Sequence, residues 1–264
     1  MTSETAPTLD SIGAQASEAL AVGVEGADPI VPPNVPIIIT IDGPAGTGKS
    51  TVARTLARRL GLDFLDTGAM YRAAAAILID REIPLDEAGE LVSAVIGADL
   101  HFDWTADPPT ILAWDAPIDH RIRDEDVTAI VSQVAAIGEL RTHMVRKQQI
   151  IAAQHPRLVS EGRDQGSIVF PDAAVKFYLD ADPSVRAKRR ADQLRLDGVE
   201  VDEAAMLERI RTRDEIDSTR EDGPLICPVD SVRIDTSPLS VLGVIDGMER
   251  VVRERVSSLI DSDG

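Results

Sequence analysis

Residues 37–51 read IIITIDGPAGTGKST, and this stretch decides the fold. Its second half satisfies the phosphate-binding pattern G-x-x-x-x-G-K-[ST] through Gly43, Gly48, Lys49 and Ser50. An apolar β-branched run at 37–41 precedes the pattern and a helical stretch at 51–60 follows it, which is the context that such a loop requires. Without that context, chance would produce the pattern in roughly one chain in a hundred of this length. The sequence therefore predicts a strand, a phosphate-binding loop and a helix, in that order.

The loop explains how an acidic chain can hold a polyanion. Glycines allow backbone N–H groups to close around phosphate oxygens, and the N-terminus of the following helix adds a favourable dipole. Lys49 supplies a positive charge, and Ser50 can ligate Mg²⁺. GTPases, ATPases and kinases share these features, so the loop alone leaves the reaction open.

The rest of the chain argues against a GTPase. Guanine recognition normally uses an [NT]-K-x-D motif, yet Asn34 is the only asparagine and no lysine follows Asn or Thr. A D-x-x-G pattern at residues 86–89 is interpreted as the start of a helix. A kinase or an ATPase is therefore favoured over a GTPase.

The remaining sequence alternates between strand-like and helix-like blocks. The apolar β-branched runs lie at 37–41, around 158–159, at 175–179 and at 232–234. Such alternation is typical of a parallel sheet covered by helices. Residues 97–120 hold two further strand-like pieces, at 100–104 and 110–114, and predict a small inserted β element. Residues 1–34 carry five acidic and no basic side chains and are expected to form a disordered acidic tail.

Charge and composition exclude several classes of partner. The 264 residues include 45 acidic and 27 basic side chains, a net charge of −18, which argues against binding to nucleic acids or anionic membranes. No uncharged apolar run approaches the ~18 residues that span a bilayer, and no Lys or Arg before Lys49 marks a secretory signal. The single cysteine, Cys227, allows no internal disulfide and is expected to be a small buried side chain. We therefore expect a cytoplasmic protein.

Six motifs in order resemble the bacterial cytidylate kinase (CMP/dCMP kinase) family over essentially all of residues 37–260. They are IDGPAGTGKST at 41–51, LDTGAMYR at 65–72, IRDEDVTAIVSQVA at 122–135, EGRDQGSIVFPDA at 161–173, RDEIDSTR at 213–220 and IDTS at 234–237. The resemblance implies the nucleoside monophosphate kinase form of the P-loop α/β fold. That fold is a three-layer sandwich with a five-stranded parallel sheet, an inserted monophosphate-binding domain and a small helical lid.

The resemblance also divides the chain and implies its reaction. The core is expected at 36–96, 121–182 and 222–264, the CMP-binding insert at about 97–120 and the lid at about 183–221, after an acidic tail of residues 1–35. The implied reaction transfers the γ-phosphoryl group of ATP to CMP or dCMP. Mg²⁺ is the expected cofactor with Ser50 as its protein ligand, and the protein is expected to be a monomer.

Roles for individual residues follow from the same resemblance. ATP is expected to be bound by Gly43, Pro44, Ala45, Gly46, Thr47, Gly48, Lys49, Ser50, Thr51, Arg186, Arg189 and Arg190. CMP is expected to be bound by Thr67, Tyr71, Arg72, Ser132, Arg141, Arg163, Asp164, Arg213, Asp217 and Arg220. Lys49, Arg163 and Arg213 are the expected catalytic residues, because they would stabilise charge on the transferring group.

The CMP residues divide by the part of the nucleotide that they would bind. They are Arg72, Arg163 and Arg213 for the phosphate, Ser132, Arg141 and Asp164 for cytosine, and Asp217 with Arg220 nearby for the ribose. Cytosine presents an amino donor beside two acceptors, so a selective pocket needs both an acceptor and a donor. Ile216 stands where the family often has a basic residue, which removes a possible contact with ATP phosphates. A kinase with a non-nucleotide acceptor and a nucleotide-responsive regulator are the alternatives.

Overall fold

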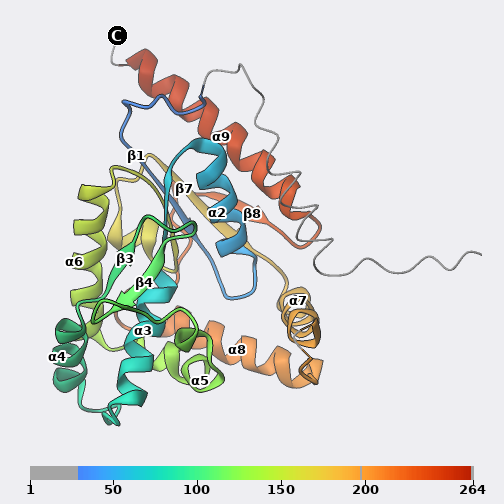
Figure 1. The fold of residues 1–264 in the computed structure, drawn as a ribbon. Helices are drawn as coiled ribbons and strands as arrows, with labels where there is room; N and C mark the ends of the chain where they lie inside the picture. The colour runs from blue at the N-terminus through green and yellow to red at the C-terminus, as the bar shows by residue number, and fades with distance from the viewer. Residues whose placement is uncertain (1–28, 197, 263–264) are drawn as a thin grey trace, which may run out of the picture.

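The computed structural model describes residues 29–196 and 198–262, so residues 1–28 of the expected tail lie outside the described range. Five parallel strands form the main sheet in the order β2-β6-β1-β7-β8 (Figure 1). They are β1 (Ile37–Asp42), β2 (Asp63–Asp66), β6 (Arg157–Gly162), β7 (Val175–Asp180) and β8 (Val232–Asp235). The five-stranded parallel sheet is confirmed, and β2 is the strand that no apolar run indicated.

Helices cover both faces of this sheet, as Figure 1 shows. They include α2 (Lys49–Leu60) and α9 (Val241–Ser262) on one face, and α3 (Thr67–Asp80) and α6 (Gly138–Gln154) on the other. Alternate side chains of β1 serve the two layers: Ile37, Ile39 and Ile41 join the hydrophobic cluster of α2 and α9, whereas Ile38 packs against the cluster of α3 and α6. The three-layer sandwich follows because the central strands bury both of their faces.

The inserted β element forms a separate antiparallel sheet. It comprises β3 (His101–Asp103), β4 (Thr110–Ala113) and β5 (Ala116–Pro117), preceded by α4 (Ala88–Ala98) and followed by η1 (Arg121–Arg123) and α5 (Glu125–Val134). Its strands lie within the predicted 97–120 segment. Phe102 and Ile111 are buried in the same hydrophobic cluster as α3, so the element shares the core of the main fold.

Two helices form the segment that was expected to be the lid. They are α7 (Pro183–Leu196), which begins at the expected proline, and α8 (Glu203–Thr219). Ala187, Met206 and Ile210 form the small buried cluster between them. Because this cluster is small and separate from the two main clusters, polar contacts are important for fixing the helix pair on the core.

The chain is ordered earlier than the predicted tail boundary at residue 35. Val31 is fully buried in the cluster of α2 and α9. Arg157 of β6 donates hydrogen bonds to the carbonyl oxygens of Val31, Pro32 and Val35. The prediction is wrong for this short segment, because composition alone did not reveal an arginine that binds its backbone.

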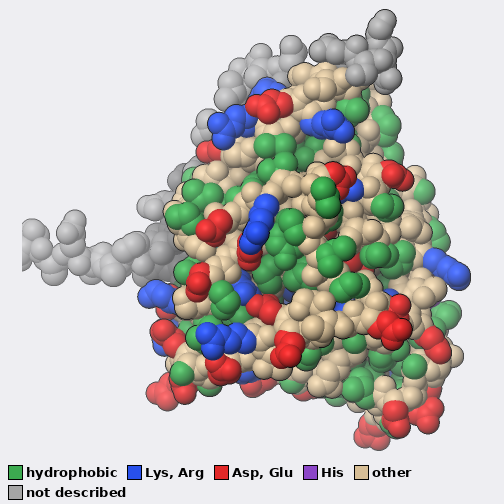
Figure 2. Space-filling model, turned by 180° about the vertical axis from the view of Figure 1, so that it is seen from behind, with side chains coloured by type: hydrophobic (Ala, Val, Ile, Leu, Met, Phe, Trp, Pro, Cys, Tyr) green, Lys and Arg blue, Asp and Glu red, His purple; other side chains and the backbone are tan. Residues whose placement is uncertain are grey.

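The surface agrees with the acidic composition. On the face drawn in Figure 2, Lys and Arg side chains lie in small groups among Asp and Glu, without a continuous basic area. Within residues 29–196 and 198–262, no helix is long and apolar enough to cross a membrane. Cys227 is exposed rather than buried, because it lies in the irregular segment between α8 and β8.

Candidate active site

The site lies where the parallel strands end. The carboxyl end of each strand of the main sheet carries an acidic residue, namely Asp42, Asp66, Glu161, Asp180 and Asp235. Ligands of open α/β sheets bind beside these strand ends. None of these five acidic residues belongs to the predicted site. Four of them, all but Asp66, lie at or just after the end of an expected strand, and that position could have indicated them.

The phosphate-binding loop runs from β1 into α2 as predicted. At Gly43 a Cβ atom would lie 2.0 Å from the carbonyl oxygen of Leu179, so only glycine fits. Gly48 caps α2 with a φ of 91°, in the left-handed region that glycine favours. Backbone geometry, rather than any side chain, therefore sets the shape of this loop.

Lys49 is folded over its own loop. Its Nζ donates a hydrogen bond of 2.7 Å to the carbonyl oxygen of Pro44. Burial, together with the charge of Arg163, lowers the pKa of Lys49 to about 7. A bound anion would restore the charged form, which is the expected behaviour of a lysine that meets phosphate.

Ser50 lies beside a carboxylate that the sequence interpretation did not include. Its Oγ donates to Glu161 Oε1 at 2.5 Å. Burial and the nearby charge of Asp66 raise the pKa of Glu161 to about 7. These oxygen donors are of the hard type that Mg²⁺ prefers, and a cation would relieve the cost of a buried carboxylate. The residues present therefore fit the expected cofactor.

Asp42 joins the loop strand to the segment after β6. Its two carboxylate oxygens accept the backbone N–H groups of Gln165 and Gly166, at 2.9 and 2.7 Å. These residues open a π-helical turn, Gln165–Val169, directly after Arg163 and Asp164. Burial raises the pKa of Asp42 to about 6. This carboxylate, also absent from the predicted site, fixes the turn that presents two predicted CMP ligands.

Arginines gather around Asp217 on the other side of the loop. Arg163 Nε donates to Asp217 Oδ2 at 3.0 Å, and Arg213 and Arg220 lie at 4.0 and 3.9 Å from its carboxylate. Burial and the charge of Arg163 lower the pKa of Arg213 to about 10. Arg213 Nε is buried without a hydrogen-bond partner among the described residues. Three guanidinium groups around one carboxylate leave an excess of positive charge for an anion.

Arg72 completes the predicted phosphate clamp from α3. Its guanidinium donates to Thr128 Oγ1 at 2.9 Å and to the carbonyl oxygen of Ile122 at 3.2 Å. Burial lowers its pKa, and Arg190 of the lid lies close enough to contribute in the same direction. Neither partner of Arg72 is a carboxylate, so its charge is available to a ligand.

The three residues predicted to bind cytosine, Ser132, Arg141 and Asp164, are all buried. Arg141 pairs with Asp164 and also donates to the carbonyl oxygen of Ala135 at 2.9 Å. The Arg141 guanidinium lies 5.3 Å from the centre of the Tyr71 ring. Ser132 is buried, with only 9% of its surface exposed, yet its hydroxyl makes no hydrogen bond with any described residue. Arg141 and Asp164 are thus fixed to each other, whereas the Ser132 hydroxyl is not engaged by any residue that the structure describes.

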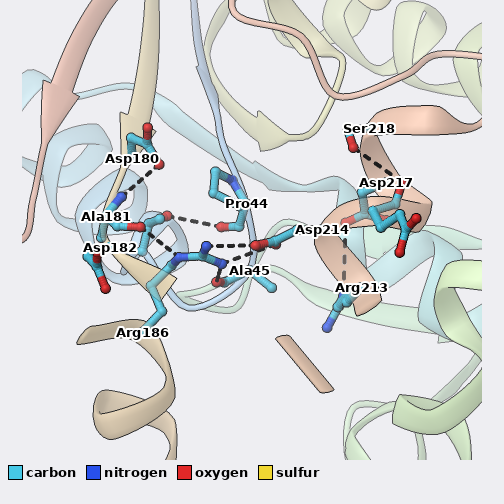
Figure 3. Close-up of polar contacts among 12 residues, drawn as sticks. Pro44, Ala45, Asp180, Ala181, Asp182, Arg186, Arg213, Asp214, Asp217 and Ser218 are labelled. Carbon is cyan, nitrogen blue, oxygen red and sulfur yellow. Dashed lines mark hydrogen bonds and ion pairs between the residues drawn. The ribbon is translucent and has the colours of Figure 1, made fainter. Parts of the chain in front are cut away.

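Thr67 and the lid arginines have partners within the protein. Thr67 Oγ1 donates to the carbonyl oxygen of Glu161 at 2.7 Å. Arg186 is buried against the phosphate loop, with Asp214, Ala45 and Ala181 as its partners (Figure 3). Arg189 donates to Thr236, and Arg190 to Gln193. The three lid arginines are therefore not gathered into one free group.

The sequence as a whole matches one protein family. The model of the cytidylate kinase family matches residues 39–254. The chain belongs to the cytidylate kinase family. A protein named cytidylate kinase from Methylococcus capsulatus is 43% identical over 218 residues, which cover 82% of this chain and 96% of that protein. Proteins of the same name from Nocardia farcinica and Rhodococcus opacus are 40% and 42% identical, over 85% and 83% of this chain and 97% and 96% of theirs.

Within this family assignment, the structure brings the expected residues into two neighbouring groups. One is the loop with Lys49 and Ser50, and the other is the arginine group around Asp217. Arg163 belongs electrostatically to both, since its charge affects Lys49 as well as Arg213. The family resemblance of the motifs and the geometry of the strand ends point to the same cleft.

Proposed function

We propose that this member of the cytidylate kinase family transfers the γ-phosphoryl group of ATP to CMP or dCMP, giving ADP and CDP or dCDP. The observation that carries the proposal is the juxtaposition of two anion-binding groups, the phosphate loop and the arginines around Asp217. A kinase whose acceptor is itself a phosphate needs two such groups side by side.

The donor side is the phosphate loop, whose backbone N–H groups and Lys49 would bind the phosphates of ATP. A cavity of about 550 Å³ lies next to it, between the ends of β7 and β8 and the start of α7. Asp180, Arg186 and Ser237 are among its lining residues. We propose that this cavity receives the adenosine part of ATP, with Arg189 and Arg190 at the lid side.

The acceptor side is the arginine group. Arg72, Arg163 and Arg213 would bind the phosphate of CMP, and the unpaired Arg213 Nε supports this role. Asp217 would accept hydrogen bonds from the ribose, with Arg220 holding the carboxylate. For the base, Ser132, Asp164 and Arg141 would supply acceptors and a donor. Tyr71 would lie beside the phosphate arginines, and Thr67 would offer a hydroxyl at the start of α3.

Mg²⁺ would be held by Ser50 Oγ, with Glu161 beside it. When bound there, the ion would supply positive charge that neutralises part of the charge of the phosphates. Asp66 adds negative charge to this place, as its effect on Glu161 indicates. Together these oxygens support the proposed cofactor.

The chemistry asks the protein for positioning and for charge neutralisation. The attacking atom is an anionic phosphate oxygen, so no strong general base is required. Lys49 would stabilise charge on the transferring group, while Arg163 and Arg213 would reduce repulsion between the two polyanions. Closure of α7 and α8 over the nucleotides would exclude water, the competing acceptor. Since one chain supplies both groups, we propose that a monomer acts, in the cytoplasm.

The test is ADP formation from ATP and Mg²⁺ with CMP, dCMP, UMP, AMP or no acceptor. We expect ADP formation to depend on CMP or dCMP and to be far slower with the other monophosphates. ADP formation that is equal without acceptor would identify an ATPase. No turnover with any monophosphate, but turnover with a hydroxyl-bearing small molecule, would favour the non-nucleotide kinase.

A further inference from the structure

Two neighbouring residues of α8 serve opposite sides of the site. Arg213 turns toward Asp217 and the acceptor group, whereas Asp214 turns toward Arg186 and the phosphate loop (Figure 3). Successive residues of a helix point about 100° apart, so one turn of α8 can contact both groups. The helix that carries the proposed CMP ligands is thereby joined to the proposed ATP loop.

Arg186 joins the two sides, and all three nitrogens of its guanidinium donate hydrogen bonds. Its Nη1 and Nη2 form a bidentate pair with Asp214 Oδ1 and Oδ2, at 3.1 and 2.6 Å. Nη1 also donates to the carbonyl oxygen of Ala45 at 3.1 Å, and Nε donates to that of Ala181 at 2.9 Å. The Arg186 side chain is 3% exposed and that of Asp214 is 25% exposed. A buried bidentate pair is directional, so it sets the orientation of α8 as well as its position.

The side chain of Arg186 is packed closely between α7 and the phosphate loop. A Cβ atom on Gly46 of the loop would lie 3.3 Å from Arg186 Cβ, so α7 lies directly against the loop backbone. By contrast, the apolar cluster that joins α7 and α8 has three buried members. Polar contacts of Asp214 therefore carry much of the connection between α8 and the donor side.

We propose that Asp214 is a positioning residue that couples ATP binding to CMP binding through Arg186 and α8. This inference rests on the proposed function, since it presupposes that the two groups bind a donor and an acceptor nucleotide. Both ligands require α8 in one orientation. Whichever ligand binds first fixes that orientation, so the second ligand no longer bears the cost of ordering the helix.

The test measures CMP affinity with and without a donor-site ligand. ADP serves as the probe, because it cannot phosphorylate CMP and the titration stays at equilibrium. Isothermal titration calorimetry gives the Kd of CMP alone and in saturating ADP with Mg²⁺. We expect the wild-type Kd to fall about fivefold or more when ADP is present. In Asp214→Asn we expect a change of less than about twofold, with the Kd of CMP alone within about threefold of wild type.

Glu215→Gln is the matched control. It removes the same charge one position along α8, from an exposed side chain that makes no ion pair with any described residue. We expect it to keep the wild-type ratio of the two Kd values. A purely structural role for Asp214 would change thermal stability and both affinities in parallel, without changing this ratio.

If Asp214→Asn does not fold, two variants that keep both charges take its place. Arg186→Lys retains the ion pair but not its bidentate geometry, whereas Asp214→Glu moves the carboxylate one methylene further from the backbone of α8; both are expected to reduce the ratio. An unchanged ratio in folded Asp214→Asn, or in these two variants where it does not fold, overturns the inference. So does a wild-type protein that turns over CMP but shows no effect of ADP. A wild-type protein that neither binds nor turns over CMP contradicts the proposed function as well.

Discussion

At the level of single residues, the site contains several ionisable side chains whose charged forms are destabilised by burial. Burial lowers the pKa of Lys49 to about 7 and that of Arg213 to about 10, and raises that of Glu161 to about 7. Such perturbed groups within one cleft are typical of functional sites. Bound phosphate would stabilise the charged forms of Lys49 and Arg213, and a bound cation would stabilise that of Glu161.

Lys49→Met tests the donor side. The substitution removes the charge at the transferring phosphate, and loss of one such contact lowers kcat by about 100-fold or more. The protein should stay folded, because the replacement is apolar and Lys49 is only 5% exposed. Steady-state kinetics and a thermal scan measure both effects. Lys188→Met, at an exposed position of α7, is the control and should keep kcat within about twofold. A near-wild-type rate for Lys49→Met would contradict the assignment.

Ser132→Ala tests base recognition. Its hydroxyl has no partner among the described residues, so the free energy of unfolding should change by less than about 0.5 kcal/mol. Loss of one hydrogen bond to cytosine should lower kcat/KM for CMP by about tenfold. Denaturant unfolding and kinetics with CMP and UMP provide the two measurements. An unchanged kcat/KM, or equal efficiency of the wild type on UMP and CMP, would remove Ser132 from the pocket.

Asp42 gives a pH-dependent prediction. Its pKa is raised from an ordinary value of 3.8 to about 6. Between these values the native protein holds a proton that the unfolded chain lacks, so this contribution to stability grows as the pH falls and is lost as the pH rises through 6. From pH 7.5 to 5 the wild type should gain about 1 kcal/mol of unfolding free energy relative to Asp42→Asn. Parallel pH profiles of the two proteins in urea unfolding would show that Asp42 does not titrate in this way.

At the level of elements, the N-terminal segment before β1 belongs to the fold. Val31 is fully buried against the α2 and α9 layer, and Arg157 holds the surrounding backbone. A chain that begins at Val35 loses Val31 and the hydrogen bonds of Arg157 to the carbonyl oxygens of Val31 and Pro32, whereas one that begins at Pro29 keeps them.

We therefore expect the chain that begins at Val35 to be less stable by about 2 kcal/mol, the usual value of one buried valine side chain. For a protein of this size that lowers the thermal midpoint by about 4 to 8 °C. The kcat should be unchanged, because neither contact touches the site. Thermal scans and kinetics of the two chains, at matched ionic strength, make the comparison. Equal midpoints would place the domain boundary at residue 35 after all.

At the level of the whole molecule, the arginines that would bind an anion destabilise the protein while no anion is bound. The net charge is −18, yet Arg163, Arg213 and Arg220 surround Asp217, and the charge of Arg72 also acts on Arg213. The pKa of Arg213 is lowered first by its burial and then by repulsion from the neighbouring arginines. A charged group that is buried beside like charges destabilises the folded protein as long as its ligand is not bound.

Arg213→Met should therefore stabilise the free protein and abolish most of its response to ligand. For the wild type, CMP at about 100 times its Kd adds about 2.7 kcal/mol to the free energy of unfolding. The variant should start from a midpoint a few degrees higher and rise much less with CMP. Differential scanning calorimetry with and without CMP measures both. A variant that is less stable than the wild type without ligand would show that Arg213 contributes to the fold.

Local patterns were enough to predict the phosphate loop, the strands at 37–41 and 175–179 and the start of α7. The reason is that glycine backbone freedom, side-chain alternation and a proline at a helix start act within a few residues of the chain. The arginines and Asp217 were predicted from motifs that resemble one family, and the structure brings Arg163, Arg213 and Arg220 together around that carboxylate.

Only the tertiary structure decided which charges meet. Asp42 binds backbone 123 residues later, Ser50 meets Glu161 across 111 residues, and Arg186 pairs with Asp214 rather than standing free for ATP. The burial of Val31 was likewise set by neighbours distant in sequence. No local pattern encodes these pairings, because a carboxylate or a guanidinium acquires its role from the desolvated partner that the packed sheet brings to it.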